Sequence, residues 1–262
     1  MKFRKQKLHQ SNLQGTKKSH KKLWVSLSIL GVILIMPLLL LGWMGLVPGL
    51  SNLMGAASPK DLGVRYGQTN INAYKQKTNL RFLDYGLAPS NPANPSEKSL
   101  LTNPTTVDQL NLTQEEVTAA INSNKWSWMP ANNVQVKFTN GIIEVSGSLD
   151  VNKIENFRQY ISGGKPLNSD ATNAINWAKR LRNNAPVYIK ASSNIADNNI
   201  TFSLLQAQIG RLNIPLGSLG ADLRNGTTSQ ISSPYFSSTS AKLLPGKIEF
   251  SGTYPTTIYV KP

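Results

Sequence analysis

The sequence predicts an α+β protein with a single N-terminal transmembrane helix, followed by an antiparallel sheet domain with a few packed helices. Three observations predict this class. One run of 25 residues carries no charge, several later segments alternate apolar and polar residues between turn signals, and other segments show apolar residues at helical spacing. With 262 residues, the chain is long enough for one medium-sized domain beside the helix.

The apolar run Leu23 to Val47 predicts a transmembrane helix. Such a helix would measure roughly 37 Å, which exceeds the ~30 Å hydrocarbon core of a bilayer. Trp24 and Trp43 lie near its ends, where indole rings prefer the membrane interfaces. Val47-Pro48-Gly49 is expected to end the helix. Cleavage of a signal peptide near Ala57 is the less favoured alternative, because a secretory apolar region is typically about 7–15 residues long.

Residues 1–22 form a basic tail. Eight of them are Lys or Arg, and the first acidic residue of the chain is Asp61, so the tail supplies much of the formal net charge of +15. The tail has no apolar period and is expected to be disordered. Positive charge beside a first apolar span stays in the cytoplasm, which predicts a single-pass protein of the cell membrane with its C-terminal domain outside. No nucleic acid is expected as a partner, because no aromatic platform accompanies the charges.

The chain has no cysteine, and its two histidines, His9 and His20, both lie in the basic tail. The absence of cysteine excludes thiol nucleophiles, zinc–thiolate sites and iron–sulfur clusters. The position of the histidines removes Ser-His-Asp triads and histidine general bases from the large domain. We therefore expect no enzyme, no cofactor and no metal site.

Residues 48–107 are predicted to be a stalk or linker with one short helix. Thr69 is a candidate cap for a helix that carries Ile71 and Tyr74. Between Ala88 and Pro104, prolines occur among Asn and Ser residues, which is typical of a loop. The extracytoplasmic α+β domain is then expected to cover residues 108–262.

The start of this domain carries two local signals. Thr113 and Glu116 have the spacing of a capping box, which predicts a helix that ends near residues 122–124. Asn140-Gly141 lies between two alternating segments and predicts a β-hairpin with a primed turn.

The rest of the domain is predicted to contain two more short helices and several strands. Helical spacing of apolar residues places the helices at about residues 154–161 and 169–182. Alternation and β-propensity place strands at residues 187–191, 200–204, 242–250 and 256–260. Pro245-Gly246 is expected to turn the last hairpin.

The pattern G-x-I-E-[V/F]-S-G occurs at residues 141–147 and again at 246–252. It places Glu144 and Glu249 at equivalent positions, opposite the core-facing residues of two strands. A matched carboxylate pair is the arrangement of glycoside hydrolases, in which the two carboxyl groups lie about 5–9.5 Å apart. A repeated hairpin with a polar solvent face is the favoured interpretation, so a hydrolase is the less favoured alternative.

The order helix, hairpin, helix and sheet, followed by Ile209-Gly210-Arg211-Leu212-Asn213-Ile214-Pro215, resembles the YpmS-like and LmeA-like single-span proteins of bacteria. Their T-x-E-x-[IL]-N-x-L-type helix is matched by Thr113, Glu115, Ile121 and Asn122. Their strand and turn motifs are matched by Gly141 to Gly147 and by Gly210 to Pro215. The resemblance covers residues 108–255 and implies a curved antiparallel sheet with helices, outside the membrane, that binds lipid.

These observations predict a membrane-anchored extracytoplasmic binding protein for a lipid or another component of the cell envelope. A sheet crossed by a helix is expected to leave an apolar groove lined by Val136, Phe138, Val145, Ile189, Phe202 and Leu204. The alternative is a structural or assembly protein of the envelope that binds a protein or a wall polymer, because aromatic residues make interface hot spots. The candidate partner surface is then Trp126, Trp128 and Met129. The sequence leaves the ligand, the partner and the oligomeric state open.

Overall fold

The computed structural model describes residues 35–45, 47, 49–91, 94–98, 100–123, 129–154, 156, 184–214, 227–230 and 235–260. The chain divides into two compact units, residues 1–39 and 40–262. The basic tail, Trp24 and the first half of the apolar run lie outside the described residues, as do most of the helices expected at 154–161 and 169–182. All contacts given below lie within the second unit.

Of the apolar run, residues 35–43 are helical. The helix was expected to end at Val47-Pro48-Gly49, but it ends earlier. The N–H of Gly45 donates to the carbonyl oxygen of Gly42 at 3.1 Å, and Gly45 has a φ of +88°, the left-handed conformation that commonly terminates helices. Within the described part of the chain, no helix combines the length and apolar character needed to cross a membrane.

In the described part of the chain, three helices and two 3-10 turns with assigned bounds follow. They are α2 (Leu50–Leu53), α3 (Gln68–Thr78), η1 (Tyr85–Leu87), α4 (Gln114–Ser123) and η2 (Val151–Lys153). The strands before residue 150 are β1 (Arg81–Asp84), β2 (Ser90–Asn91), β3 (Asn94–Lys98), β4 (Leu101–Thr113), β5 (Ala131–Thr139) and β6 (Ile142–Leu149). The later strands are β7 (Ala185–Ala196), β8 (Asn199–Ile209), β9 (Leu212–Asn213), β10 (Thr227–Gln230), β11 (Ser237–Leu244) and β12 (Lys247–Val260).

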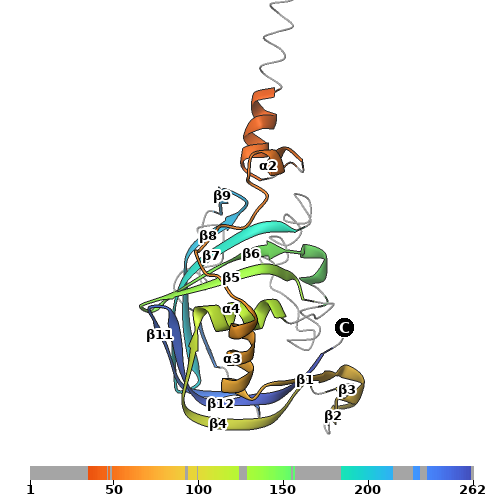
Figure 1. The fold of residues 1–262 in the computed structure, drawn as a ribbon, viewed down its shortest axis with the longest axis vertical. Helices are drawn as coiled ribbons and strands as arrows, with labels where there is room; N and C mark the ends of the chain where they lie inside the picture. The colour runs from red at the N-terminus through yellow and green to blue at the C-terminus, as the bar shows by residue number, and fades with distance from the viewer. Residues whose placement is uncertain are drawn as a thin grey trace, which may run out of the picture. The chain divides into compact units, whose positions relative to one another are not determined.

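Ten of the strands form one open sheet, in which β12, β11, β7, β6 and β5 follow one another. The sheet branches at two strands, because β4 and β1 also pair with β12 and β8 also pairs with β7. All pairings in this sheet are antiparallel except that of β1 with β12. The α+β class with a mostly antiparallel sheet is therefore confirmed. Figure 1 shows this sheet curving around α4 and α3.

The two central hairpins turn in different ways. The turn between β5 and β6 has a positive φ only at Gly141, +66°, so the primed turn expected from Asn140-Gly141 is wrong. The Gly141 N–H donates to the carbonyl oxygen of Leu243 and its own carbonyl accepts from Ser193, so contacts with neighbouring strands hold this turn. The primed type occurs instead between β7 and β8, where Asp197 and Asn198 both have positive φ.

Strand β12 is paired along both edges and nevertheless contains Pro255. One edge of β12 pairs with β4, and the other pairs first with β11, up to Thr253, and then with β1, from Thr257. Pro255 lies in the gap between β11 and β1, so its missing N–H removes no bond to β11 or to β1. Pro104 pairs opposite Pro255 inside β4. Residues 101–104 are thus strand and not the expected loop, and β4 runs across the boundary expected between residues 107 and 108.

Helix α4 begins as its sequence predicts. The Thr113 N–H donates to Glu116 Oε2 at 2.9 Å, and the Glu116 N–H donates to Thr113 Oγ1 at 3.2 Å. The capping box is therefore confirmed, and the helix ends at Ser123 as expected. Helix α3 is different, because it starts at Gln68 rather than after Thr69. Its first turn is capped by Asn70, whose Oδ1 accepts from the Gly67 N–H at 2.9 Å.

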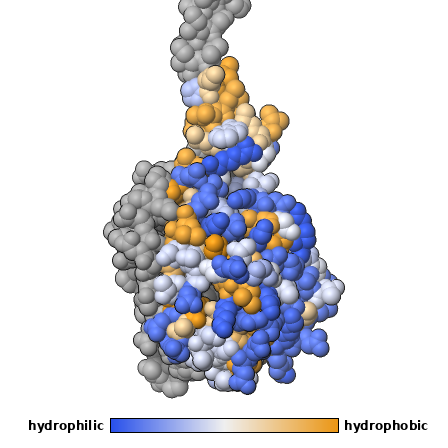
Figure 2. All heavy atoms as spheres, turned by 90° about the vertical axis from the view of Figure 1, so that its left-hand side faces the viewer, coloured by the Kyte–Doolittle hydropathy of each residue, from blue (hydrophilic) through white to orange (hydrophobic). Residues whose placement is uncertain are grey.

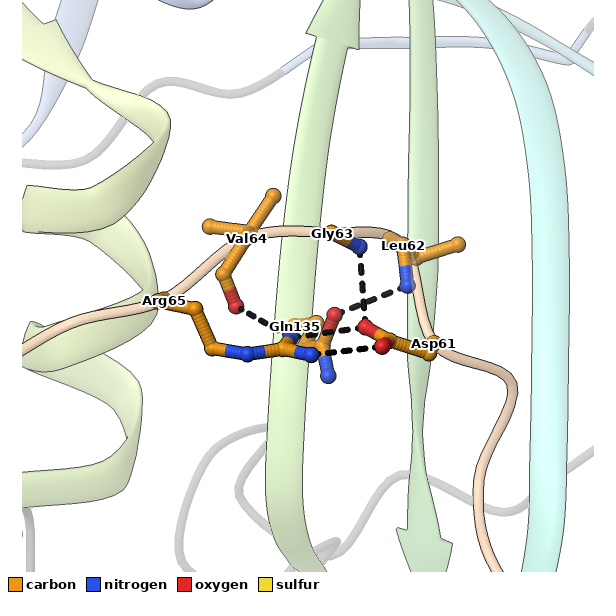
Figure 3. Close-up of polar contacts among 6 residues, drawn as sticks. All are labelled: Asp61, Leu62, Gly63, Val64, Arg65 and Gln135. Carbon is orange, nitrogen blue, oxygen red and sulfur yellow. Dashed lines mark hydrogen bonds and ion pairs between the residues drawn. The ribbon is translucent and has the colours of Figure 1, made fainter.

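The segment 56–66, which we call the strap, crosses the face of the sheet opposite α3 and α4. Leu62 and Val64 pack with Tyr188 on this face. The Leu62 N–H donates to Gln135 Oε1 at 2.8 Å, and the Asp61 carboxylate accepts from Gly63 and Arg65 (Figure 3). The strap leads directly into α3, so the chain passes around the edge of β5 from one face of the sheet to the other.

Candidate functional site

The inner face of the curved sheet and its two helices line a partly open cavity of about 640 Å³. This volume lies within the usual range of ligand pockets, about 300–1,000 Å³. Its walls come from α3, α4, β4, β5, β6, β7, β8, β11 and β12, so almost every element of the domain contributes.

Strand alternation places the lining side chains. Every second residue of a strand lies on one face, and the sheet register joins these residues into rows across the inner face. Phe250 lies opposite Leu110, and Ile248 lies opposite Leu112. On the same face, β7 and β8 place Ile195 opposite Ile200 and Ser193 opposite Phe202. Strands β5 and β6 place Phe138 opposite Ile143. All ten of these residues line the cavity.

Aromatic rings form one end of the lining. The ring of Phe250 lies 5.7 Å from that of Phe236 and 6.2 Å from that of Tyr254, the second pair in an edge-to-face arrangement. Such pairs contribute about 0.5–1.5 kcal/mol beyond the area that they bury. On the opposite side, α4 supplies Val117, Ala120 and Ile121.

Among the described residues, no charged side chain lines the cavity, and the polar side-chain groups in its lining are the hydroxyls of Tyr74, Thr78, Ser193 and Tyr254. The Tyr254 hydroxyl donates to the carbonyl oxygen of Thr78 at 3.2 Å, and Thr78 Oγ1 donates to that of Tyr74 at 2.8 Å. Burial raises the pKa of Tyr74 and of Tyr254, so both phenols stay neutral at physiological pH. The site offers hydrogen bonds but no ionic contact.

The six residues expected to line an apolar groove fall on this same inner face. The register aligns Val136 with Val145 and Ile189 in one row, and places Phe138 and Leu204 in the next row through Ile143 and Ala191. Only Phe138 and Phe202 line the cavity. Val136 is 2% exposed and Val145 packs beside it, because both lie under α4. Ile189 is 40% exposed and Leu204 is half-buried, outside the cavity.

The other candidate residues are a partner surface and a carboxylate pair. Trp126 and Trp128 lie outside the described residues, and Met129 is half-buried. Glu144 accepts a hydrogen bond from the Tyr188 hydroxyl at 2.6 Å, whereas Glu249 forms an ion pair with Lys247 at 2.7 Å. These two carboxylates lie on strands that do not pair with each other. Among the described residues, no three His, Asp or Glu side chains are grouped so as to hold a metal ion.

Sequence reasoning missed the contribution of α3 and β12 to the cavity. In β12 the signal was present, because Ile248, Phe250, Tyr254 and Ile258 all have even numbers and therefore share a face. No comparable signal marks α3. Tyr74 and Thr78 lie four residues apart on one helix face, but nothing local to α3 shows that this face meets β12.

The fold and the cavity together define a mixed α/β protein in which a large, open, mostly antiparallel sheet holds an apolar pocket against two helices. Compared with family models, curated proteins and solved structures, the chain shows no match to any of them.

Proposed function

We propose that the protein binds a lipid in the cavity between the sheet and its helices, as a membrane-anchored protein whose sheet domain lies outside the cell membrane. The observation that carries this proposal is the apolar cavity of about 640 Å³. Well-packed domains leave few voids larger than a water molecule, so an apolar space of this size is better explained by a ligand than by imperfect packing.

The energetics of such a cavity favour a long hydrocarbon chain. Each buried methylene contributes about 0.8 kcal/mol, so about a dozen of them supply roughly 10 kcal/mol. Association costs an estimated 4–15 kcal/mol in lost freedom of motion. A short apolar molecule therefore binds weakly in this cavity, whereas an acyl chain of lipid length offsets the cost.

The anchoring part of the proposal rests on the apolar helical residues before α2. Their large side chains are mostly exposed, among them Ile35, Met36, Leu38, Leu40 and Trp43, and in α2 Leu53 is 84% exposed. Figure 2 shows hydrophobic colour on this part of the chain and mainly hydrophilic colour on the face of the sheet domain turned to the viewer. Exposed apolar residues gathered in this way favour contact with a bilayer, and the basic tail favours the inner side for the N-terminus.

A structural or assembly role remains the second candidate, and one observation favours it. Among the described strands, β4 pairs only with β12 over its 13 residues, so its outer edge offers backbone groups to a strand from a partner. Pro104 and the positive φ of Asn103 interrupt this edge, which weakens the argument.

Photo-crosslinking of the full-length protein in its membrane tests the proposal. A lipid with a diazirine in its acyl chain is incorporated and activated, and the modified peptides are mapped by mass spectrometry. We expect modification of peptides from α4, β8 and β12, and its loss when the cavity is filled by Ala120→Phe or Ile195→Phe. Ile189→Phe adds the same ring on the same face outside the cavity and should leave the labelling unchanged. Labelling confined to residues 23–47 would refute lipid binding in the cavity.

A further inference from the structure

The four hydroxyl groups of the cavity differ in what they contact. Those of Tyr254 and Thr78 are engaged, since each donates to a backbone carbonyl of α3. No hydrogen bond joins the Tyr74 or the Ser193 hydroxyl to another residue in the described part of the chain. Tyr74 and Ser193 are half-buried, so their hydroxyls lose contact with solvent when a ligand fills the cavity. A ligand that places a polar atom beside one of them would offset that loss.

Of these two, Tyr74 is the better placed to contact a ligand. Its ring carries the hydroxyl several bonds away from α3, whereas the Ser193 hydroxyl stays close to the sheet. Burial is the main cause of the raised pKa of Tyr74, and the nearby Tyr254 adds to it. The Tyr74 hydroxyl therefore remains protonated in the apolar surroundings and is available as a donor.

The lining also restricts the charge of the ligand. An ionised carboxylate or ammonium group buried without an opposite charge is strongly unfavourable, and the part of the chain that the structure describes contributes no Lys, Arg, Asp or Glu to the cavity lining. The polar group that meets Tyr74 must then be an uncharged acceptor. The common acceptor of this kind on an acyl chain is the carbonyl oxygen of an ester.

Building on the proposed lipid-binding function, we infer that the cavity takes an uncharged acyl ester and that the Tyr74 hydroxyl donates a hydrogen bond to its carbonyl oxygen. Any charged headgroup stays outside the cavity. A free fatty acid binds less well, because its carboxylate would have to be buried or protonated.

Three diazirine probes with the same chain length test this inference in the full-length protein, reconstituted in phosphatidylcholine nanodiscs. They are an alkyl methyl ester, an alkane and a fatty acid, and the measurement is the probe concentration that half-saturates cavity labelling. We expect the ester to label best. Tyr74→Phe should raise the half-saturating concentration of the ester about threefold to tenfold, the factor that one neutral hydrogen bond contributes. The value for the alkane should not change.

Two control variants locate the effect. Ser193→Ala removes the other unengaged hydroxyl of the cavity and tests whether that group, rather than Tyr74, meets the ester. Tyr188→Phe removes a hydroxyl on the opposite face of the sheet, where Tyr188 packs with Leu62 and Val64 of the strap, and should leave the preference for ester over alkane unchanged. Equal labelling of the cavity by ester and alkane would overturn the role of Tyr74 but leave lipid binding standing. An equal loss of both probes in Tyr74→Phe, or a loss of ester preference only in Ser193→Ala, would also overturn it. If no probe labels the cavity, the proposed function itself fails.

Discussion

The side chain of Asn122 forms two hydrogen bonds with the backbone of Val134. Its Nδ2 donates to the Val134 carbonyl oxygen at 2.7 Å, and its Oδ1 accepts from the Val134 N–H at 2.9 Å. One turn earlier on α4, Thr118 Oγ1 accepts from the Val136 N–H at 3.0 Å. Another turn earlier, Gln114 Oε1 accepts from the Phe138 N–H at 3.3 Å. Side chains of a helix thus take the place of a neighbouring strand along the edge of β5.

Two repeat distances make this match possible. Four residues of an α-helix rise about 6 Å, and two residues of a strand rise about 6.6 Å. The positions 114, 118 and 122 of α4 therefore stay in step with the positions 134, 136 and 138 of β5, in reverse order, for three successive contacts.

The first prediction concerns this edge. Asn122→Leu keeps the side-chain size but removes both hydrogen bonds to Val134, together with the one that Nδ2 donates to the Thr118 carbonyl oxygen. The N–H and carbonyl of Val134 are then unpaired at a partly buried position. We expect a loss of about 2–3 kcal/mol in the free energy of unfolding, measured by chemical denaturation. Ser123→Ala is the matched control, since Ser123 bonds only within the helix, to Ala120. Equal stability of Asn122→Leu and the parent protein would show that the edge contacts contribute nothing.

The second prediction concerns the contact between the two helices. Lys77 Nζ of α3 lies 2.7 Å from Glu116 Oε1 of α4, and the same carboxylate caps α4 through Thr113. Glu116→Gln keeps a capping acceptor but removes the ion pair, whereas Glu116→Ala removes both. We expect the alanine variant to lose about 1 kcal/mol more than the glutamine variant. Lys77→Met should lose more than the glutamine variant, because it leaves the buried Glu116 carboxylate without its cation and removes the bond from Lys77 to the Asn111 carbonyl oxygen. Equal stability of Glu116→Gln and Glu116→Ala would contradict the division between cap and ion pair.

The third prediction is a pH dependence of the strap. The guanidinium of Arg65 and, next, the N–H of Gly63 hold the pKa of Asp61 well below its usual range. A carboxyl group whose pKa is lowered on folding stabilises the folded state above its unfolded pKa of about 3.9, and this contribution is lost as the pH falls below that value. The stability difference between the parent protein and Asp61→Asn should therefore shrink between pH 5 and pH 2. Because the pair is exposed, high salt should reduce the difference as well.

The fourth prediction compares two glycines with left-handed φ. Gly141 has a φ of +66° with open space around its Cβ position, so Gly141→Ala should cost only the conformational strain, about 1–2 kcal/mol. Gly210 has a φ of +61°, and a Cβ there would collide with the carbonyl oxygen of Met44.

Gly210→Ala should therefore also separate the turn after β8 from residues 44–56. This turn is held there by the Arg211 N–H, which donates to Met44, and by the Arg211 side chain beside Trp43. Limited proteolysis should cut the segment 44–56 faster in Gly210→Ala than in Gly141→Ala. Equal cleavage rates in the two variants would show that the turn does not hold the segment.

The features that the sequence predicted correctly depend on local chemistry. The capping box of Thr113 and Glu116 is complete within a few residues. Pro245-Gly246 also marked its turn correctly, although the backbone of Gly246 bonds to Phe138 and Gln114 as well. The pairing of Leu83 with Tyr259 joins residues far apart in the chain, and no local pattern encodes such a partner. The primed turn expected at Asn140-Gly141 failed for a related reason, because Leu243 and Ser193 fix that turn from other strands.

In the candidate site, too, the sequence predicted the local feature but not the one that depends on distant parts of the chain. Alternation placed the six expected groove residues on one face, as the register shows, since the side-chain period of a strand is two. It could not determine which part of that face a helix would cover. Helix α4 lies over Val136 and Val145, and the cavity opens further along, beside Phe138 and Phe202.

The pairing of β12 with both β1 and β4 has a consequence for how the chain matures. A ribosome makes the chain from its N-terminus, so β1 and β4 are complete long before their common partner at residues 247–260 emerges. The same strand, β12, also supplies part of the cavity wall and the hydrogen bond from Tyr254 to α3. Biosynthetic intermediates therefore expose an unfinished, apolar interior until residues 247–260 have been made, and a chain truncated before residue 247 should be recognised by chaperones and proteases rather than accumulate.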